Sequence, residues 1–185
     1  MESLDKTGKL YVFGLDDVLF PRKDFILQVY YLFASFYEFT EQSVTAKDML
    51  STMKKVYEHH GEDAVFPALQ ALYQIDDKYK ENFERLQANA ALPLPLLIYP
   101  KLEELLAELR SQGKAIAILA DGNPVEQLNK IRFIDWGINQ DLRKEIKLFF
   151  KEELAFRDLE VLPYLAELYQ IETKDIVLVD TSLFL

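Results

Sequence analysis

The sequence predicts an α/β fold in which a parallel sheet is interleaved with helices and one helical subdomain is inserted. Four short apolar runs have the composition of buried parallel strands, and each run after the first follows a stretch with helical periodicity. These runs are Leu10–Phe13, Ala115–Leu119, Ile146–Phe150 and Ile176–Val179. A strand, a helix and a second strand in this order form a βαβ unit, so the strands are expected to lie parallel in one sheet.

A helix is predicted directly before the second apolar run. Pro100 suits its first turn and Gly113 suits its C-terminal end. Four leucines between them fall on one helical face: Leu102, Leu105, Leu106 and Leu109. This helix and the strand after it form half of a βαβ unit.

Another helix is predicted to start just after the second apolar run. Asn123 can cap it, Pro124 can be its first residue, and Glu126 can complete a capping box.

The chain between the first strand and Pro100 has a different character, with helical periodicity and few strand signals. Its most apolar stretch, Phe25–Phe39, is typical of a buried helix in a bundle. Two further helical stripes follow, the first ending at Gly61 and the second containing Pro67: Leu50, Met53 and Tyr57, then Val65, Leu69 and Leu72. We therefore expect residues 1–21 and 99–185 to form the α/β core, and residues 22–98 to form an all-helical cap.

The composition is that of a globular protein with 185 residues, of which 50% are hydrophobic and 28% are charged. A net charge of -10 opposes binding to nucleic acid or to an anionic membrane, so neither partner is expected. The absence of cysteine excludes disulfides and thiolate chemistry. The first ten residues lack a signal-peptide pattern and no apolar run is long enough to cross a bilayer, which favours a cytoplasmic location.

The most informative segment is Tyr11–Phe20, an apolar strand that runs into Asp16 and Asp17. It resembles the opening motif of the haloacid dehalogenase superfamily, in which a hydrophobic strand leads into Asp-x-Asp. In that family the first Asp forms a covalent intermediate with the substrate, and the second acts as general acid and base. Asp16 matches the second Asp, but Gly14 stands at the first and has no nucleophilic atom.

The resemblance implies a Rossmann-like haloacid dehalogenase core with a helical cap of the C1 type inserted after the first strand. In the family's sheet the fourth, first, second and third strands lie side by side in that order, and a fifth strand lies beyond the fourth. Here the chain ends soon after the fourth run, which is expected to leave an apolar edge from Ile176 to Leu185. We expect homodimerisation, a protein partner at this edge, or cover from the cap.

The phosphate-binding motifs of the family are only partly matched. Ala120 stands where the family has Thr or Ser, which leaves the backbone amides of Asp121 and Gly122 to bind an anion. For the lysine of the third motif, Arg157 is the best positional candidate and Lys151 is less well placed. A small phosphorylated ligand is the expected partner if this site retains its function.

The metal-binding motif is also incomplete. The family holds Mg²⁺ with acidic residues, of which Asp16 and Asp180 are matched, and no second acidic residue follows Asp180. Mg²⁺ is the expected cofactor if there is one, with weak or absent binding. His59 and His60 have no partner at metal-ligand spacing and are expected on the surface.

Two functions remain open from the sequence. The first is a hydrolase homologue that is catalytically inactive and acts as a binding or regulatory protein. The second is a Mg²⁺-dependent phosphatase of small phosphate esters, in which Asp16 would act through an atypical mechanism, for instance by activating water.

Overall fold

The computed structural model describes residues 7–179, which fold into two compact units. The first unit contains the chain up to Arg22 and the chain from Pro95 onwards, and the second is Lys23–Leu94. The sequence analysis placed the second boundary after residue 98. The difference has a structural reason, because β2 (Leu96–Leu97) pairs with β4 (Ile134–Asp135) inside the first unit.

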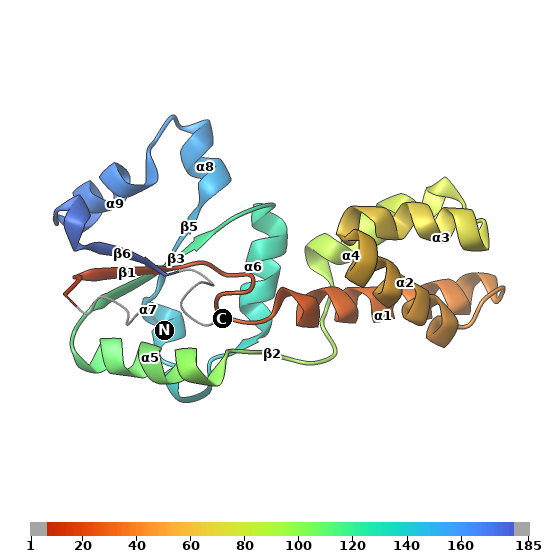
Figure 1. Ribbon diagram of the computed structural model, residues 1–185, viewed down its shortest axis with the longest axis horizontal. Helices are drawn as coiled ribbons and strands as arrows, with labels where there is room; N and C mark the ends of the chain where they lie inside the picture. The colour runs from red at the N-terminus through yellow and green to blue at the C-terminus, as the bar shows by residue number, and fades with distance from the viewer. Residues whose placement is uncertain (1–6, 180–185) are drawn as a thin grey trace. The chain divides into compact units, whose positions relative to one another are not determined.

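The first unit is built on a parallel sheet of four strands in the described part of the chain (Figure 1). They are β1 (Leu10–Phe13), β3 (Ala115–Ala120), β5 (Lys147–Phe150) and β6 (Ile176–Val179). Their spatial order is β5, β3, β1, β6, and every pairing is parallel. This order is the one that the resemblance implies for the first four strands, and it confirms the predicted α/β class.

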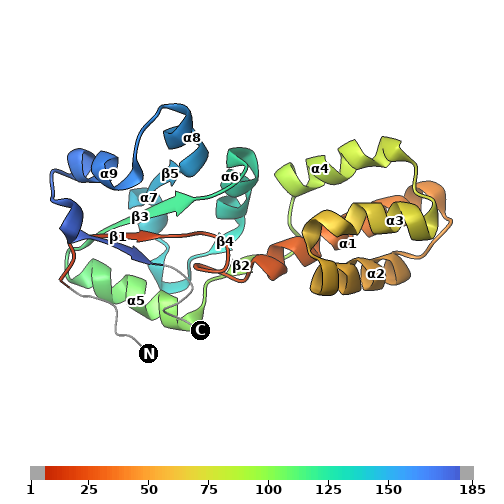
Figure 2. The ribbon, with the colours of Figure 1, turned by 45° about the horizontal axis from the view of Figure 1, so that its top comes forward.

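Helices cover both faces of this sheet (Figures 1 and 2). On one face lie α8 (Lys151–Phe156) and α9 (Val161–Tyr169), and on the other lies α5 (Pro100–Ser111). The side chains between this face of the sheet and α8 and α9 form one apolar cluster. Alternate residues of each strand contribute to it, since they point to the same side of the sheet. Its buried members are Leu10, Val12, Ala117, Leu119, Phe149, Leu154 and Leu165.

The helix after β3 is α6 (Pro124–Phe133), and α7 (Leu142–Glu145) follows it before β5. Asn123 caps α6 as predicted, since its side chain accepts a hydrogen bond from the Val125 amide at 2.9 Å. Pro124 is the first residue of the helix. Glu126, which the sequence analysis assigned to a capping box, forms an ion pair with Lys130 through its carboxylate.

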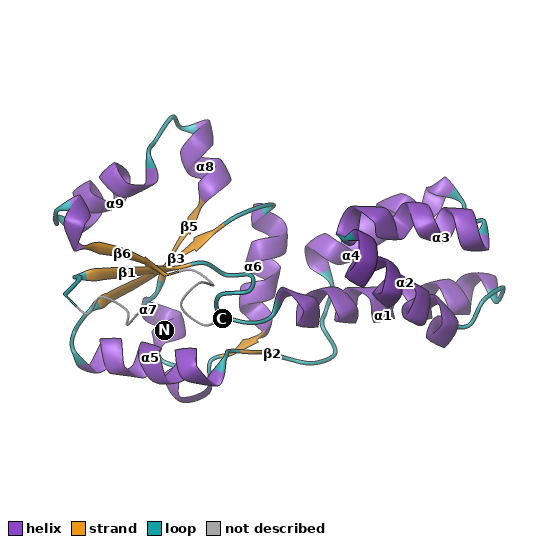
Figure 3. Cartoon of the chain, viewed as in Figure 1, coloured by secondary structure: helices purple, strands orange, loops and turns teal. Residues whose placement is uncertain are grey.

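The second unit is all-helical, as predicted (Figure 3). Its helices are α1 (Arg22–Glu41), which enters it from the first unit, α2 (Ala46–His60), α3 (Val65–Tyr73) and α4 (Lys80–Asn89). Gly61 ends α2 at a φ of 82°, a left-handed conformation that favours glycine. The unit is packed on aromatic rings. Phe33 and Phe83 lie edge to face at 5.1 Å between ring centroids, and the Phe66 and Phe83 rings are tilted by 37° at 5.5 Å.

Short 3-10 helices connect these elements at Glu62–Ala64, Asp77–Tyr79, Gly137–Asn139 and Thr173–Asp175. Over residues 7–179, the structure contains no helix with the length and apolarity that a membrane crossing needs.

Candidate functional site

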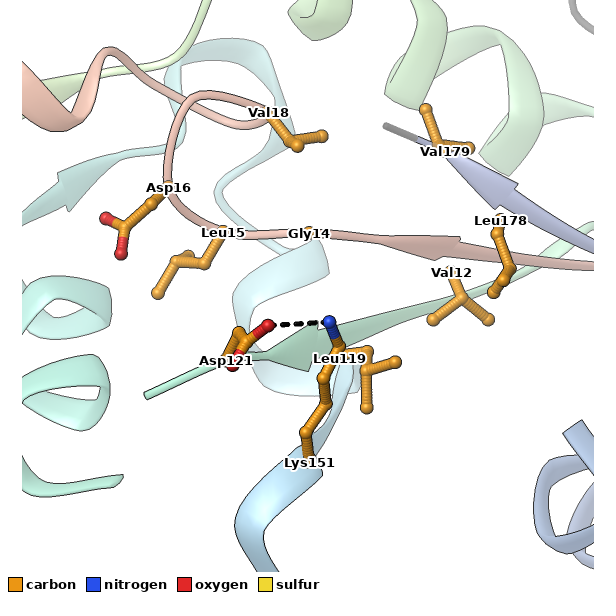
Figure 4. Close-up of a pocket in the computed structure, with 10 residues that line it drawn as sticks. All are labelled: Val12, Gly14, Leu15, Asp16, Val18, Leu119, Asp121, Lys151, Leu178 and Val179. Carbon is orange, nitrogen blue, oxygen red and sulfur yellow. Dashed lines mark hydrogen bonds and ion pairs between the residues drawn. The ribbon is translucent and has the colours of Figure 1, made fainter. Parts of the chain in front are cut away.

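The candidate site is a pocket at the carboxyl ends of β1, β3 and β6, the position where open parallel sheets bind ligands. Its volume is about 310 Å³, and Figure 4 shows the residues that line it. The described residues that line it all belong to the first unit: Val12, Gly14, Leu15, Asp16, Val18, Leu119, Asp121, Lys151, Leu178 and Val179. The structure thus brings four predicted positions, Gly14, Asp16, Asp121 and Lys151, to one pocket.

The chain makes a tight turn as it leaves β1. Asp17 adopts a left-handed conformation with a φ of 58°, and its amide donates to the Phe20 carbonyl at 2.9 Å. The Asp17 carboxylate accepts a hydrogen bond from the Arg22 amide at 2.8 Å, where α1 begins. Asp17 therefore stabilises the turn through its amide, and its carboxylate accepts a hydrogen bond from the first residue of α1.

Gly14 is the first residue after β1 and lines the pocket. A Cβ atom at this position would lie 2.9 Å from the Val18 Cγ2 atom, closer than carbon atoms pack. Valine is stiff about χ1, so its methyl group cannot easily move away. The structure therefore has no room for a side chain at position 14 unless Val18 shifts.

Asp16 is held by three donors on one oxygen. Its Oδ2 atom accepts from Lys130 Nζ at 2.7 Å, Arg22 Nη1 at 2.8 Å and Gln127 Nε2 at 3.0 Å. Lys130 is 0% exposed and also pairs with Glu126 at 2.5 Å, while Arg22 lies 3.7 Å from the same Glu126 carboxylate. We call Asp16, Arg22, Glu126 and Lys130 the buried ion-pair network after its fully buried lysine. The side chains of the other three residues are 16–29% exposed.

The sequence analysis did not identify Arg22, Gln127 or Lys130 as site residues. The Glu126–Lys130 spacing, four residues apart on α6, is the one local signal of their pairing. Nothing in the sequence indicates that Asp16, 114 positions before Lys130, lies against the same helix. The network fixes the Asp16 carboxylate by Oδ2, whereas Oδ1 is buried and has no hydrogen-bond partner within the described residues.

Ala120, Asp121 and Gly122, which the sequence analysis aligned with a phosphate-binding motif, lie at the end of β3 and directly after it. Ala120 ends that strand, fully buried and without a hydroxyl group, as the sequence indicates. Asp121 Oδ2 forms an ion pair with Lys151 Nζ at 2.6 Å, and the Gly122 amide donates to Glu152 Oε1 at 2.5 Å. The hydrogen bond from Lys151 lowers the pKa of Asp121, against the opposing effect of burial. Two of the donors considered for phosphate, Lys151 and the Gly122 amide, are therefore paired with carboxylates of the protein itself.

The structure places Lys151, and not Arg157, at the pocket. Arg157 follows α8, pairs with Glu153 at 3.3 Å and lies over the Tyr164 ring at 5.7 Å from its centroid. The preference for Arg157 was based on motif alignment, but α8 intervenes between β5 and Arg157. Lys151 is the first residue of that helix and extends into the pocket (Figure 4).

The described residues do not fit a magnesium site. Residues 7–179 contain no group of three or more acidic or histidine side chains that could hold a metal ion. Asp16 Oδ2 already accepts three hydrogen bonds, and Asp180 lies outside the described residues. His59 and His60 are exposed in the last turn of α2, in the other unit.

Solved structures of similar fold exist, although no protein-family model and no curated protein sequence matches this chain. A Thermotoga maritima protein provisionally assigned as a beta-phosphoglucomutase aligns with 92% of this chain and 74% of its own, at 19% identity and a TM-score of 0.55. A HAD family hydrolase from Deinococcus radiodurans, solved with bound phosphate and sodium, aligns with 94% of this chain and 72% of its own, at 17% identity and a TM-score of 0.51.

A third similar structure is a haloacid dehalogenase-like family hydrolase from Xanthomonas campestris. It is 14% identical, with 94% of this chain and 73% of that chain covered and a TM-score of 0.50. The protein therefore has the fold of the haloacid dehalogenase-like hydrolases, as the opening motif indicates.

Proposed function

We propose that this protein is a homologue of the haloacid dehalogenase-like hydrolases that has lost phosphoryl transfer and acts as a binding or regulatory protein. The observation that carries this proposal is Gly14, which stands at the nucleophile position with the Val18 methyl group 2.9 Å from where a Cβ would lie. Loss of a covalent nucleophile alone removes several orders of magnitude in rate.

The environment of Asp16 supports the same proposal. A general acid must deliver its proton to a leaving group within hydrogen-bond reach. Asp16 Oδ2 is instead turned to Arg22, Gln127 and Lys130. In this position the carboxylate stabilises the fold around a buried lysine.

The alternative function is a Mg²⁺-dependent phosphatase of small phosphate esters that uses Asp16 to activate water. The unpartnered Oδ1 atom of Asp16 favours it, because that oxygen could still accept a proton. The surroundings oppose it, since the groups that could bind an anion are already paired. Lys151 pairs with Asp121, and the Gly122 amide donates to Glu152. We expect Mg²⁺ binding to be weak or absent.

A phosphatase assay separates the two functions. The protein is incubated with para-nitrophenyl phosphate and a panel of small phosphate esters, with millimolar Mg²⁺. We expect no turnover above buffer. Turnover that disappears in the Asp16→Asn variant, but not in a matched Asp141→Asn variant at an exposed position, would establish the phosphatase and refute the proposal.

The nucleophile position can also be tested by restoring it. Gly14→Asp is expected to destabilise the fold by about 1–3 kcal/mol through overpacking, and Val18→Ala in the same chain is expected to relieve part of that cost. Neither variant should turn over phosphate esters, because Asp16 stays in its network. Urea unfolding measures the change in stability, and the phosphatase assay measures turnover.

We further propose that β6 pairs with a second chain, either another copy or a different protein. It is an edge strand of the described sheet, and edge strands present backbone groups that can pair with another chain. A monomeric mass in light scattering at high protein concentration would argue against self-association.

A further inference from the structure

The walls of the pocket are mainly aliphatic. More than half of its described lining residues are valine or leucine: Val12, Leu15, Val18, Leu119, Leu178 and Val179. Such side chains offer no hydrogen bonds to a ligand and favour apolar groups that leave water. Figure 4 shows them on β1 and the loop that follows it, on β3 and on β6.

The charged groups of the pocket are already paired within the protein. Lys151 is the one cation among the described lining residues, and it forms an ion pair with Asp121. Glu152 accepts the Gly122 amide beside that pair. A phosphate group would have to displace Asp121 and approach Glu152, and both carboxylates repel it.

We propose that this pocket binds a small, uncharged and largely apolar organic molecule and rejects the phosphorylated form of the same molecule. The inference rests on the proposed function, since a working phosphatase would need the opposite preference. The volume of about 310 Å³ is sufficient for a molecule with a single six-membered ring.

The probes are a matched pair, benzyl alcohol and benzyl phosphate. Each is titrated into the full chain with labelled leucine and valine methyl groups, and NMR follows the shifts. We expect benzyl alcohol to give saturable shifts at Val12, Val18 and Leu119, with a Kd on the order of millimolar. Val65 and Leu69 of the helical unit should not move, and benzyl phosphate should bind at least about ten-fold more weakly.

Two pairs of variants test the contribution of the walls and of the carboxylate. Leu178→Gln removes an apolar wall at a position 50% exposed, and we expect binding of benzyl alcohol to weaken about ten-fold. Leu168→Gln, at a position 42% exposed on α9 and outside the pocket lining, is the matched control and should bind like the unmodified chain.

Asp121→Asn removes the negative charge beside Lys151 and should strengthen benzyl phosphate binding about ten-fold. Glu153→Gln, on the same helix as Lys151 but paired with Arg157, should not change it.

The proposal is overturned if benzyl alcohol gives no shifts at the pocket methyl groups up to its solubility limit. It is equally overturned if benzyl phosphate binds as tightly as the alcohol, or if Leu178→Gln and Leu168→Gln weaken binding to the same extent. These outcomes differ from failure of the proposed function, which is turnover of a phosphate ester. A chain without turnover that also fails to bind benzyl alcohol would keep the proposed function and lose this inference.

Discussion

Two groups of opposite charges lie at the carboxyl end of the same sheet, and they differ in burial. In the buried ion-pair network, Lys130 is 0% exposed and is paired with Asp16 and Glu126. In the pocket, Lys151 and Asp121 are 50% and 69% exposed at their side chains. Buried charges are costly to separate from their partners, whereas exposed pairs contribute little. The comparison leads us to expect that loss of a charge from the network costs more stability than loss of a charge from the pocket pair.

The largest expected effect is the loss of Lys130. The Lys130→Met variant leaves the carboxylates of Asp16 and Glu126 without the buried cation between them, and should lower the free energy of unfolding by about 3 kcal/mol. Urea denaturation measures this change. Lys101→Met, at an exposed position of α5, is the control and should change stability by less than about 0.5 kcal/mol. Equal effects of the two variants would show that the buried ion-pair network does not stabilise the fold.

A smaller loss is expected for Asp16→Asn. The amide keeps the shape of the side chain but removes the charge that Lys130 and Arg22 share, at a cost of about 2 kcal/mol. The matched variant is Asp121→Asn, which should cost less than about 1 kcal/mol because its pair is exposed. If Asp16→Asn changed the rate of a reaction and left stability intact, Asp16 would act in catalysis and not in stabilising the fold.

The sequence predicted the sheet at whose end both groups of charges lie, but only some of the charged residues. Buried parallel strands are continuous apolar runs, so all four strands of the larger sheet were identified. Gly14 was identified as a candidate site residue because its motif is a continuous segment, and the structure places Gly14 in the pocket lining. By contrast, β2 and β4 have two residues each, too few for any periodicity.

The buried network could not be predicted because its partners are brought together by the fold. Gln127 lies 111 positions from Asp16 in the sequence, and lysine is ordinarily an exposed residue. Arg157 was preferred over Lys151 for a related reason, since the path of the chain through α8 decides which cation reaches the pocket.

The exposed pair gives the next prediction. Lys151→Met should lower the free energy of unfolding by less than about 1 kcal/mol, several times less than Lys130→Met. The small effect should shrink further at high salt, since exposed charges are screened by ions. Urea denaturation at low and high ionic strength tests both statements. A loss as large as that of Lys130→Met would show that Lys151 also holds the fold together.

The smallest expected effect is the pH dependence of the pocket pair. The pKa of Asp121 is lowered in the folded protein, chiefly by the hydrogen bond from Lys151, so the pair contributes stability above the pKa of an unfolded Asp, about 3.9. That contribution is lost as pH falls through the lower folded-state pKa. Carboxyl NMR titration should find the midpoint of Asp121 below its ordinary value, and Lys151→Met should return it upwards. A midpoint that Lys151→Met leaves unchanged would mean that Asp121 is not held by this ammonium, and that the pocket is open to anions.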